Sequence, residues 1–221
     1  MTLSRYGVRE WGLATAAAVA IIVWFWPNQW IALSSIFVWI VVAGFFRDPL
    51  LRRPATDDTK DLVSPADGVV SAVIDVPSHE SVDGPAVIVR IFLSVLDVHI
   101  NRMPCDAELV HMRHMPGRYL DARTEESARV NESNLLCLRT PTGIRFGVRQ
   151  VSGAIARRIV CPLRAGDLLS RGQRFGMIKF GSTTELIVPR ALVEAILVTK
   201  GARVKGGVTI LVRLRDSALP S

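Results

Sequence analysis

Residues 86–93 read AVIVRIFL, an almost purely apolar run in which β-branched residues dominate. Val and Ile favour extended backbone, and a run of this length suits a strand better than a helix. The stretch therefore predicts a β-strand. The sequence on either side indicates that the rest of the domain is built in the same way.

Short apolar runs recur along the chain, separated by Gly and Pro. The turn Ser64-Pro65-Ala66-Asp67-Gly68 precedes one of them, and four glycines within residues 164–181 suit tight turns between strands. Residues 122–130 are predicted to form a short helix or a loop. The predicted strands are 69–76, 86–93, 108–112, 135–138, 144–151, 154–160, 187–189 and 208–213. The pattern predicts a mainly β domain, a compact barrel or sandwich.

Residues 11–46 differ from the rest, because they contain no charged residue and hold all five tryptophans. Pro27-Asn28-Gln29 divides this segment into arms at 11–26 and 31–46. Each arm has 16 residues, against about 20 for a bilayer span, and the flanking residues supply the difference. We therefore expect an N-terminal helical membrane hairpin, with a re-entrant, half-inserted hairpin as the alternative.

Arginines flank the apolar segment on both sides and predict its orientation. Arg5 and Arg9 precede it, and Arg47, Arg52 and Arg53 follow it, which places both ends on the cytoplasmic face. A cleaved signal peptide is disfavoured, because no small-residue cleavage site is evident and a second apolar arm follows. The predicted domains are the hairpin at 1–46, a connector at 47–61 and a catalytic domain at 62–221.

The formal net charge of +7 indicates an anionic partner. Aromatic and basic residues are not interleaved, so the apolar segment favours an anionic membrane over nucleic acid. Cys105, Cys137 and Cys161 are odd in number and widely spaced, so the sequence predicts neither disulfides nor a metal site. His111 and His114 are the two histidines that could share a local face.

The dipeptide Gly181-Ser182 can carry unusual chemistry. Gly tolerates strained backbone and leaves its carbonyl unhindered, so a following Ser hydroxyl can attack that carbonyl. Elimination from the resulting ester and hydrolysis leave a pyruvoyl group at the new chain end. A pyruvoyl carbonyl forms a Schiff base with an amine and accepts electrons as CO2 leaves, as pyridoxal phosphate does. By itself, a Gly-Ser step is a weak signal.

The surrounding run RFGMIKFGSTTELIVP is similar to the processing motif of the phosphatidylserine decarboxylase proenzymes. Further blocks resemble the short bacterial and archaeal form of that family in the same order, and the resemblance covers about residues 44–200. These blocks are FFRDPLLRRP, LVSPADGVV, FLSVLDVHINRMP, PGRYLDA, NESN and QVSGAIARRIVCPLRAGD.

The resemblance implies roles for individual residues. Gly181 and Ser182 match the cleavage dipeptide, Asp67 matches an Asp of the processing relay, and His99 matches a histidine tied to decarboxylation. The family's long form has a second histidine where this chain has Arg102, and arginine cannot act as a base near neutral pH. Either His99 serves both steps, or Asp67 and strain suffice for cleavage, or another histidine such as His114 takes part.

Each of these residues also has an ordinary structural explanation. Asp67 suits a β-turn, and His99 could be a half-buried imidazole with satisfied hydrogen bonds. Arg102 either pairs with Asp97 or Asp106 or supplies a cation for the substrate's phosphate or carboxylate.

The resemblance implies a carboxy-lyase that converts phosphatidylserine to phosphatidylethanolamine. The expected catalytic residues are Ser182, His99 and Asp67, and the cofactor is covalent pyruvate derived from Ser182. Cleavage between 181 and 182 would give a β chain (1–181) and an α chain (182–221) that stay together as a heterodimer, with further oligomerisation open. The substrate is phosphatidylserine or its archaeal ether counterpart, archaetidylserine, and the expected location is the cytoplasmic face of the cell membrane.

Two other classes of protein fit parts of the sequence. A membrane-anchored carrier module of the biotinyl or lipoyl type would explain the glycine turns near residue 170, but no Met-Lys-Met-type acceptor lysine is present at a hairpin tip. A pyruvoyl decarboxylase for a soluble amino acid or its adenosyl derivative would explain Gly181-Ser182, but it would need no anchor.

Overall fold

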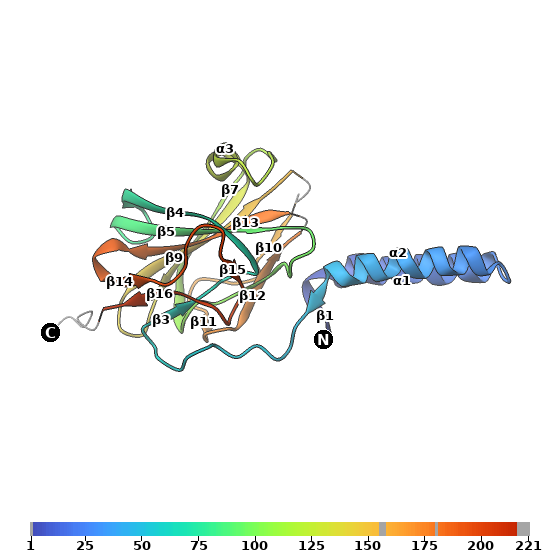
Figure 1. The fold of residues 1–221 in the computed structure, drawn as a ribbon, viewed down its shortest axis with the longest axis horizontal. Coiled ribbons are helices and arrows are strands. Elements are labelled where there is room, and N and C mark those ends of the chain that lie inside the picture. The colour runs from blue at the N-terminus through green and yellow to red at the C-terminus, as the bar shows by residue number, and fades with distance from the viewer. Residues whose placement is uncertain (1, 155–157, 180, 216–221) are drawn as a thin grey trace. The chain divides into compact units, whose positions relative to one another are not determined.

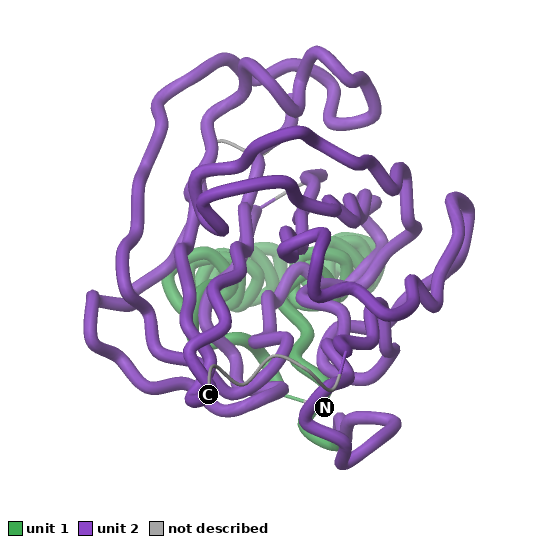
Figure 2. Tube along the Cα trace, turned by 90° about the vertical axis from the view of Figure 1, so that its left-hand side faces the viewer, with its two compact units in different colours: residues 1–51 green, residues 52–221 purple. Residues whose placement is uncertain are grey.

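The computed structural model describes residues 2–154, 158–179 and 181–215. Strands make up 41% and helices 22%, which confirms the predicted mainly β class. The chain divides into two compact units, residues 1–51 and 52–221, coloured separately in Figure 2.

The N-terminal unit is a hairpin of two antiparallel helices, α1 (Val8–Trp24) and α2 (Gln29–Phe45), as Figure 1 shows. The indole of Trp39 donates to the hydroxyl of Thr15 across the helix pair (2.8 Å). The side chain of Asn28 accepts hydrogen bonds from the first backbone N–H groups of α2, so it forms the N-cap. The predicted helical hairpin is therefore confirmed.

The surface of this hairpin is apolar. Trp24, Trp26 and Phe37 are each at least two-thirds exposed, a distribution that is unfavourable in water and suits lipid. The helical segment Arg5–Trp24 is long and apolar enough to cross a membrane, whereas Gln29–Phe45 is shorter. The short 3-10 helix η1 (Arg5–Gly7) extends α1, and strands β1 (Thr2–Leu3) and β2 (Arg47–Asp48) pair where the hairpin begins and ends.

The larger unit holds the remaining elements. They are β3 (Asp61–Val63), β4 (Gly68–His79), β5 (Gly84–Leu93), β6 (Ile100–Arg102), β7 (Ala107–Met115), α3 (Glu125–Val130), β8 (Ser133–Arg139), β9 (Arg145–Ser152), β10 (Ile159–Val160), β11 (Leu168–Leu169), β12 (Arg174–Ile178), β13 (Ser182–Pro189), η2 (Arg190–Leu192), β14 (Val193–Ile196), β15 (Arg203–Val204) and β16 (Ile210–Leu214).

Eight strands form one curled sheet in the order β11-β7-β8-β9-β13-β5-β4-β15, a half-barrel. Two three-stranded sheets, β10-β12-β6 and β14-β16-β3, complete the unit. The main core contains side chains from all three sheets, among them Val89 on β5, Leu186 on β13, Phe175 on β12 and Val212 on β16. The small sheets therefore pack against the large one around a shared core.

Most of the predicted strands are present with shifted bounds, and two differ more strongly. Residues 187–189 are the end of the longer strand β13, which begins at Ser182. Of the strand predicted at 154–160, the end is present as β10, residues 154 and 158 are not in a strand, and residues 155–157 lie outside the described part. The glycine-rich segment contains turns as predicted, with Gly166 and Gly172 at positive φ. The short helix α3 starts at an N-cap formed by Thr124.

Strand β13 lies in the middle of the large sheet and pairs antiparallel with both β5 and β9. Its first residue, Ser182, is opposite Leu93 on one side and Ser152 on the other. All but the last residue of the strand are buried. The predicted cleavage dipeptide thus lies at the point where the chain enters the most enclosed strand of the sheet.

Candidate active site

The backbone at Gly181 has φ +64°, in the left-handed region where glycine is favoured. A β-carbon at this position would meet no atom within 4 Å, so the conformation rather than crowding calls for glycine. The next residue, Ser182, starts β13 and is fully buried. The dipeptide therefore joins a sharp change of backbone direction to a rigid strand.

The hydroxyl of Ser182 has no hydrogen-bond partner among the described residues. Leaving a buried hydroxyl unpaired costs about 1–3 kcal/mol, so it is an uncommon arrangement in a native fold. The hydroxyl of Thr183 is also buried without a described partner, but side chains alternate along a strand, so it faces the opposite side of β13. An unpaired hydroxyl next to a left-handed glycine is available for reaction.

His99 is fully buried and lies immediately before β6. Its Nδ1 is 2.9 Å from the carbonyl oxygen of Asp97, so we assign the ring proton to Nδ1. The Nε2 atom then accepts a hydrogen bond from the backbone N–H of Gly181 (3.3 Å). The structure thus brings the predicted histidine and the predicted cleavage dipeptide into direct contact.

The carboxylate of Asp67 is engaged elsewhere. It forms a two-point ion pair with Arg52, in which Arg52 Nη2 lies 2.7 Å from Asp67 Oδ2, and its Oδ1 accepts from the N–H of Gly206 (2.8 Å). Arg52 also donates to the carbonyl of Gly206 (2.8 Å). The described contacts of Asp67 therefore join the connector, the turn before β4 and the segment after β15. They do not include His99 or Ser182.

Neither of the other two candidate residues has a described contact with the dipeptide. Arg102 is buried, and its Nη1 donates to the carbonyl of Gly172 (3.0 Å). His114 is about half exposed, with Nε2 3.5 Å from a carboxylate oxygen of Glu132. His114 lies on β7, three strands from β13 in the sheet, which corresponds to about 14 Å.

Gly153, immediately after β9, lies against the carbonyl of Gly181. A β-carbon on Gly153 would be 2.3 Å from the Gly181 carbonyl oxygen and 3.0 Å from the β-carbon of Ala122. Real β-carbons essentially never approach another atom this closely, so only glycine permits the packing. The carbonyl of the predicted scissile bond is thus held in place by a second glycine.

A buried chain of amide side chains lies beneath the start of β13. Asn101 donates to the hydroxyl of Thr184 (3.0 Å), Gln150 donates to Asn101 (2.8 Å), and Asn134 donates to Gln150 (3.2 Å). Asn101 is two residues beyond His99, and Thr184 is two residues beyond Ser182. The bond between them therefore links the segment that carries His99 to the strand that carries Ser182.

Comparison with known proteins assigns the family. Residues 39–212 match the sequence profile of phosphatidylserine decarboxylase. The chain belongs to the phosphatidylserine decarboxylase family. The proenzyme of this name from Carboxydothermus hydrogenoformans is 42% identical over 85% of this chain and 86% of its own length. The one from Symbiobacterium thermophilum is 45% identical over 79% and 80%, and the one from Rhodopirellula baltica 40% identical over 96% and 88%.

This membership confirms the resemblance seen in the sequence, and it rules out the carrier-module alternative, because the family is one of carboxy-lyases. Gly153, Asn101, Gln150 and Asn134 were not predicted as site residues. All four lie within blocks that resemble the family, but the blocks alone do not show which atoms these residues contact. The amides sit singly in separate strands, so no local pattern connects them.

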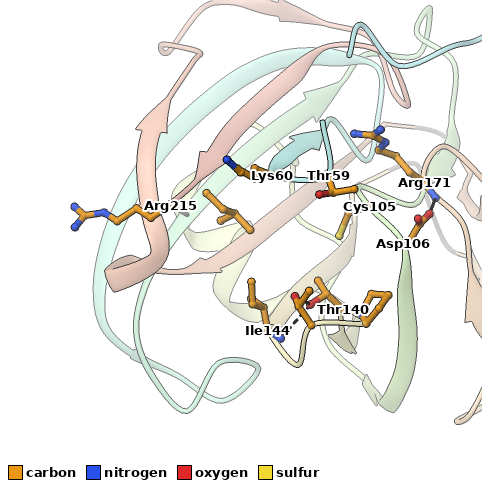
Figure 3. Close-up of a pocket in the computed structure, with 11 residues that line it drawn as sticks. Thr59, Lys60, Cys105, Asp106, Thr140, Ile144, Arg171 and Arg215 are labelled. Carbon is orange, nitrogen blue, oxygen red and sulfur yellow. Dashed lines mark hydrogen bonds between the residues drawn. The ribbon is translucent and has the colours of Figure 1, made fainter. Parts of the chain in front are cut away.

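A cavity of about 360 Å³ lies elsewhere in this decarboxylase fold, beside the turn that joins β8 to β9 (Figure 3). Cys105, Thr140 and Ile144 are among its lining residues, and the guanidinium of Arg215 extends away from the others. The turn is at the start of β9, whereas Ser152 at the end of β9 pairs with Ser182. Seven residues of strand separate the two ends, roughly 23 Å, so the cavity is separate from the cleavage dipeptide.

Cys105, Cys137 and Cys161 are free cysteines, not paired in disulfides. Burial raises the pKa of the Cys105 thiol to about 12 and that of Cys161 to about 11, so both are protonated thiols at neutral pH. Within the described ranges, no three His, Cys, Asp or Glu residues are grouped so as to hold a metal ion.

Proposed function

We propose that this chain decarboxylates phosphatidylserine to phosphatidylethanolamine with a pyruvoyl group made from its own Ser182. The observation that carries the proposal is the buried, unpaired hydroxyl of Ser182 next to the left-handed Gly181, whose N–H is bonded to His99. The relatives' name, proenzyme, supports a maturation step before activity. The residues present therefore fit the precursor of a pyruvoyl group.

Self-processing proceeds on groups of the chain itself. The Oγ of Ser182 bonds to the carbonyl carbon of Gly181, the C–N bond breaks, and the nitrogen of Ser182 takes up a proton. In the resulting ester, loss of the Ser182 α-proton and of the Gly181 carboxylate from the β-carbon gives dehydroalanine. Tautomerisation and addition of water release ammonia and leave the pyruvoyl group on the chain that begins at 182. The other chain ends in the carboxylate of Gly181.

His99 is our choice for the proton transfers. Among the described histidines it is the one with a hydrogen bond to the cleavage dipeptide, and its Nε2 carries the lone pair that faces Gly181. An imidazole changes protonation near neutral pH, so it can take a proton during cleavage and return one during turnover. The exposed position of His114 supports a single histidine for both steps rather than a second one.

The pyruvoyl group, once formed, supplies a carbonyl that captures the amine of serine and accepts electrons as CO2 departs. Residues around it then have two tasks. Burial of Ser182 excludes water from the place where charge develops, and His99 returns a proton to the substrate's α-carbon.

We assign supporting roles to Asp67 and Arg102. The ion pair of Asp67 with Arg52 joins the connector to the catalytic domain. It fixes the neighbouring Gly68, which packs against the carbonyl of Phe92. Asp67 therefore influences the site by positioning this backbone. Phe92 in turn pairs with Thr183. Arg102 stabilises the turn at Gly172 by donating a hydrogen bond to its carbonyl.

Membrane attachment follows from the same proposal, because the substrate is a lipid. The apolar hairpin would hold the enzyme at the cell membrane, and the arginines flanking it would keep both ends on the cytoplasmic face. The two chains produced by cleavage, 1–181 and 182–221, would remain together as a heterodimer.

Intact-mass spectrometry of the purified protein tests the proposal. We expect two chains that divide between 181 and 182, with the smaller one lacking a free amino group and reacting with a carbonyl reagent. Ser182→Ala should stay uncut and inactive. Thr183→Val, which removes the neighbouring unpaired hydroxyl, should cut normally. An active enzyme that consists of one uncut chain would contradict the proposal.

A further inference from the structure

The turn of residues 94–97 connects β5 to His99 and is locked at both ends. The N–H and hydroxyl of Ser94 both donate to Asp97 Oδ2 (2.9 and 2.8 Å), and the N–H of Asp97 donates to the carbonyl of Ser94 (2.9 Å). These three bonds fix a single conformation of the turn. Its shape is therefore set before any ligand arrives.

Two apolar side chains lie at the tip of this rigid turn. Val95 is 45% exposed and Leu96 is 83% exposed, while Asp97 is buried. An exposed leucine alone is unremarkable in a soluble protein. Here the bonds between Ser94 and Asp97 fix the backbone that carries the apolar pair at the surface.

Both ends of the 94–97 turn contact the candidate active site. Leu93, immediately before the turn, pairs with Ser182, and the carbonyl of Asp97 accepts from His99. His99 in turn contacts Gly181. Whatever surface the tip of the turn meets is therefore brought next to the cleavage dipeptide.

A cation flanks the turn. Arg203 Nη1 is 3.4 Å from Asp97 Oδ1, and the side chain of Arg203 is 74% exposed. A guanidinium has five N–H donors in a planar fork, and this long contact uses one nitrogen. The rest of the fork faces solvent, in a geometry that suits the two free oxygens of a phosphodiester.

We propose that the 94–97 turn docks the active site onto the bilayer, with Val95 and Leu96 entering the interfacial layer and Arg203 binding the phosphodiester of phosphatidylserine. This inference rests on the proposed function for the identity of the lipid. An apolar tip beside a cation matches the order of groups in a phospholipid, acyl chain first and phosphate next. The turn thus presents the serine headgroup to the site that His99 and Ser182 form.

A dye at the tip tests docking without relying on catalysis. In the full chain with Ser182→Ala, a Leu96→Cys side chain is labelled with an environment-sensitive fluorophore, and the protein is added to phosphatidylcholine vesicles that contain phosphatidylserine. The matched control is Leu168→Cys, because Leu168 is 80% exposed on β11 at the edge of the sheet. Protein with the native cysteines alone corrects for background labelling.

We expect the dye at 96 to brighten and to be quenched by nitroxide-bearing lipid, and the dye at 168 to do neither. Equal responses at the two positions, or no response at 96, would overturn the proposal. A response at 96 in full-chain protein that floats with the vesicles shows contact with lipid, whether or not the chain is a decarboxylase.

Kinetics of the mature enzyme separate binding at the surface from chemistry. Leu96→Ser should raise the half-saturating surface fraction of phosphatidylserine about tenfold, the effect of losing the transfer of one leucine side chain from water. Turnover of a dissolved short-chain phosphatidylserine should stay within about twofold. Leu168→Ser should change neither quantity, and an equal loss on both substrates would refute docking.

The cation is tested in the same assay. Arg203→Gln should raise the half-saturating surface fraction of phosphatidylserine severalfold, and Arg203→Lys should raise it less. Arg145→Gln is the control, since Arg145 is also an exposed arginine that pairs with an aspartate, Asp83. Identical behaviour of the Arg203 and Arg145 variants would remove Arg203 from the proposal. Absence of any decarboxylation by the wild type would instead refute the proposed function and leave the dye result standing.

Discussion

Replacing Gly153 with alanine should slow self-cleavage without unfolding the protein. The new β-carbon would lie 2.3 Å from the Gly181 carbonyl oxygen, whereas ordinary contacts begin near 3.4 Å. One of the two groups must therefore move by about 1 Å. A displacement of about 1 Å at a reacting carbonyl costs roughly 100-fold in rate, so we expect cleavage to slow by about that factor.

The assay follows the fraction of cut chain over time by intact mass, beginning directly after rapid purification. Hydroxylamine attacks esters, so it should split a chain that has completed the acyl shift and leave an unreacted amide intact. We expect hydroxylamine not to split Gly153→Ala, because the slowed step is attack on the Gly181 carbonyl, so the variant accumulates the amide rather than the ester. Molecules that do become cut should decarboxylate at the wild-type rate per pyruvoyl group, since the Gly181 carbonyl has by then become a chain end.

Two controls separate this contact from general damage to the fold. Gly84→Ala adds a β-carbon that meets nothing within 4 Å, so it should mature normally. Ala122→Gly, added to Gly153→Ala, relieves the second close contact at 3.0 Å but leaves the carbonyl contact. Recovery of cleavage in the double variant would assign the effect to Ala122. Cleavage of Gly153→Ala at the wild-type rate would refute the reasoning altogether.

Three further predictions concern the anchor, the histidine and the fold. Deleting residues 1–46 should move the protein to the soluble fraction while self-cleavage persists; pelleting with lipid at high salt would place the anchor elsewhere. His99→Ala should leave the chain largely uncut and lower turnover at least about 100-fold; a cut but inactive product would confine His99 to decarboxylation, and near-normal activity would remove its role. Hydrogen bonds from Arg213 lower the pKa of the buried Asp61 carboxyl, so its stabilisation is complete above the ordinary aspartate pKa and is lost as pH falls through the lowered value. Asp61→Asn should therefore lower the free energy of unfolding by about 1–2 kcal/mol near neutral pH and by less in acid. Chemical denaturation measures this, and a difference between wild type and variant that does not change with pH would contradict the prediction.

The strands could be predicted from sequence because their signal is local. Residues 86–93 are β5 almost unchanged, since β-branched side chains and flanking turn residues mark such an element within ten positions. The hairpin was equally visible, because a charge-free segment of this length has few alternatives. The order of the eight strands was not predictable, because pairings such as Thr183 with Phe92 join residues about ninety positions apart.

The site was predictable to the extent that single residues carry its chemistry. The family resemblance points to Gly181, Ser182 and His99, and in the structure His99 accepts a hydrogen bond from the backbone N–H of Gly181. The partner of Asp67 was not foreseen, since Arg52 belongs to the connector and had been considered only for membrane orientation. Contacts of this kind depend on which distant segments the fold brings together, and no short sequence motif predicts that.

The central position of β13 has a consequence for how the enzyme would refold after the proposed cleavage. Residues 182–189 pair along their length with β5, and 182–187 also pair with β9. The chain released by the proposed cleavage would therefore begin as a central strand of a folded sheet. It could not bind the folded larger chain as a subunit binds from solution, because β5 and β9 would first have to separate to admit it. With the proposed cleavage, the proenzyme folds as one polymer, whereas the mature enzyme, once denatured, would have to reunite two. Recovery of activity from denaturant should then depend on protein concentration for the cut form alone, so severing one peptide bond turns a repeatable folding reaction into one that effectively happens once.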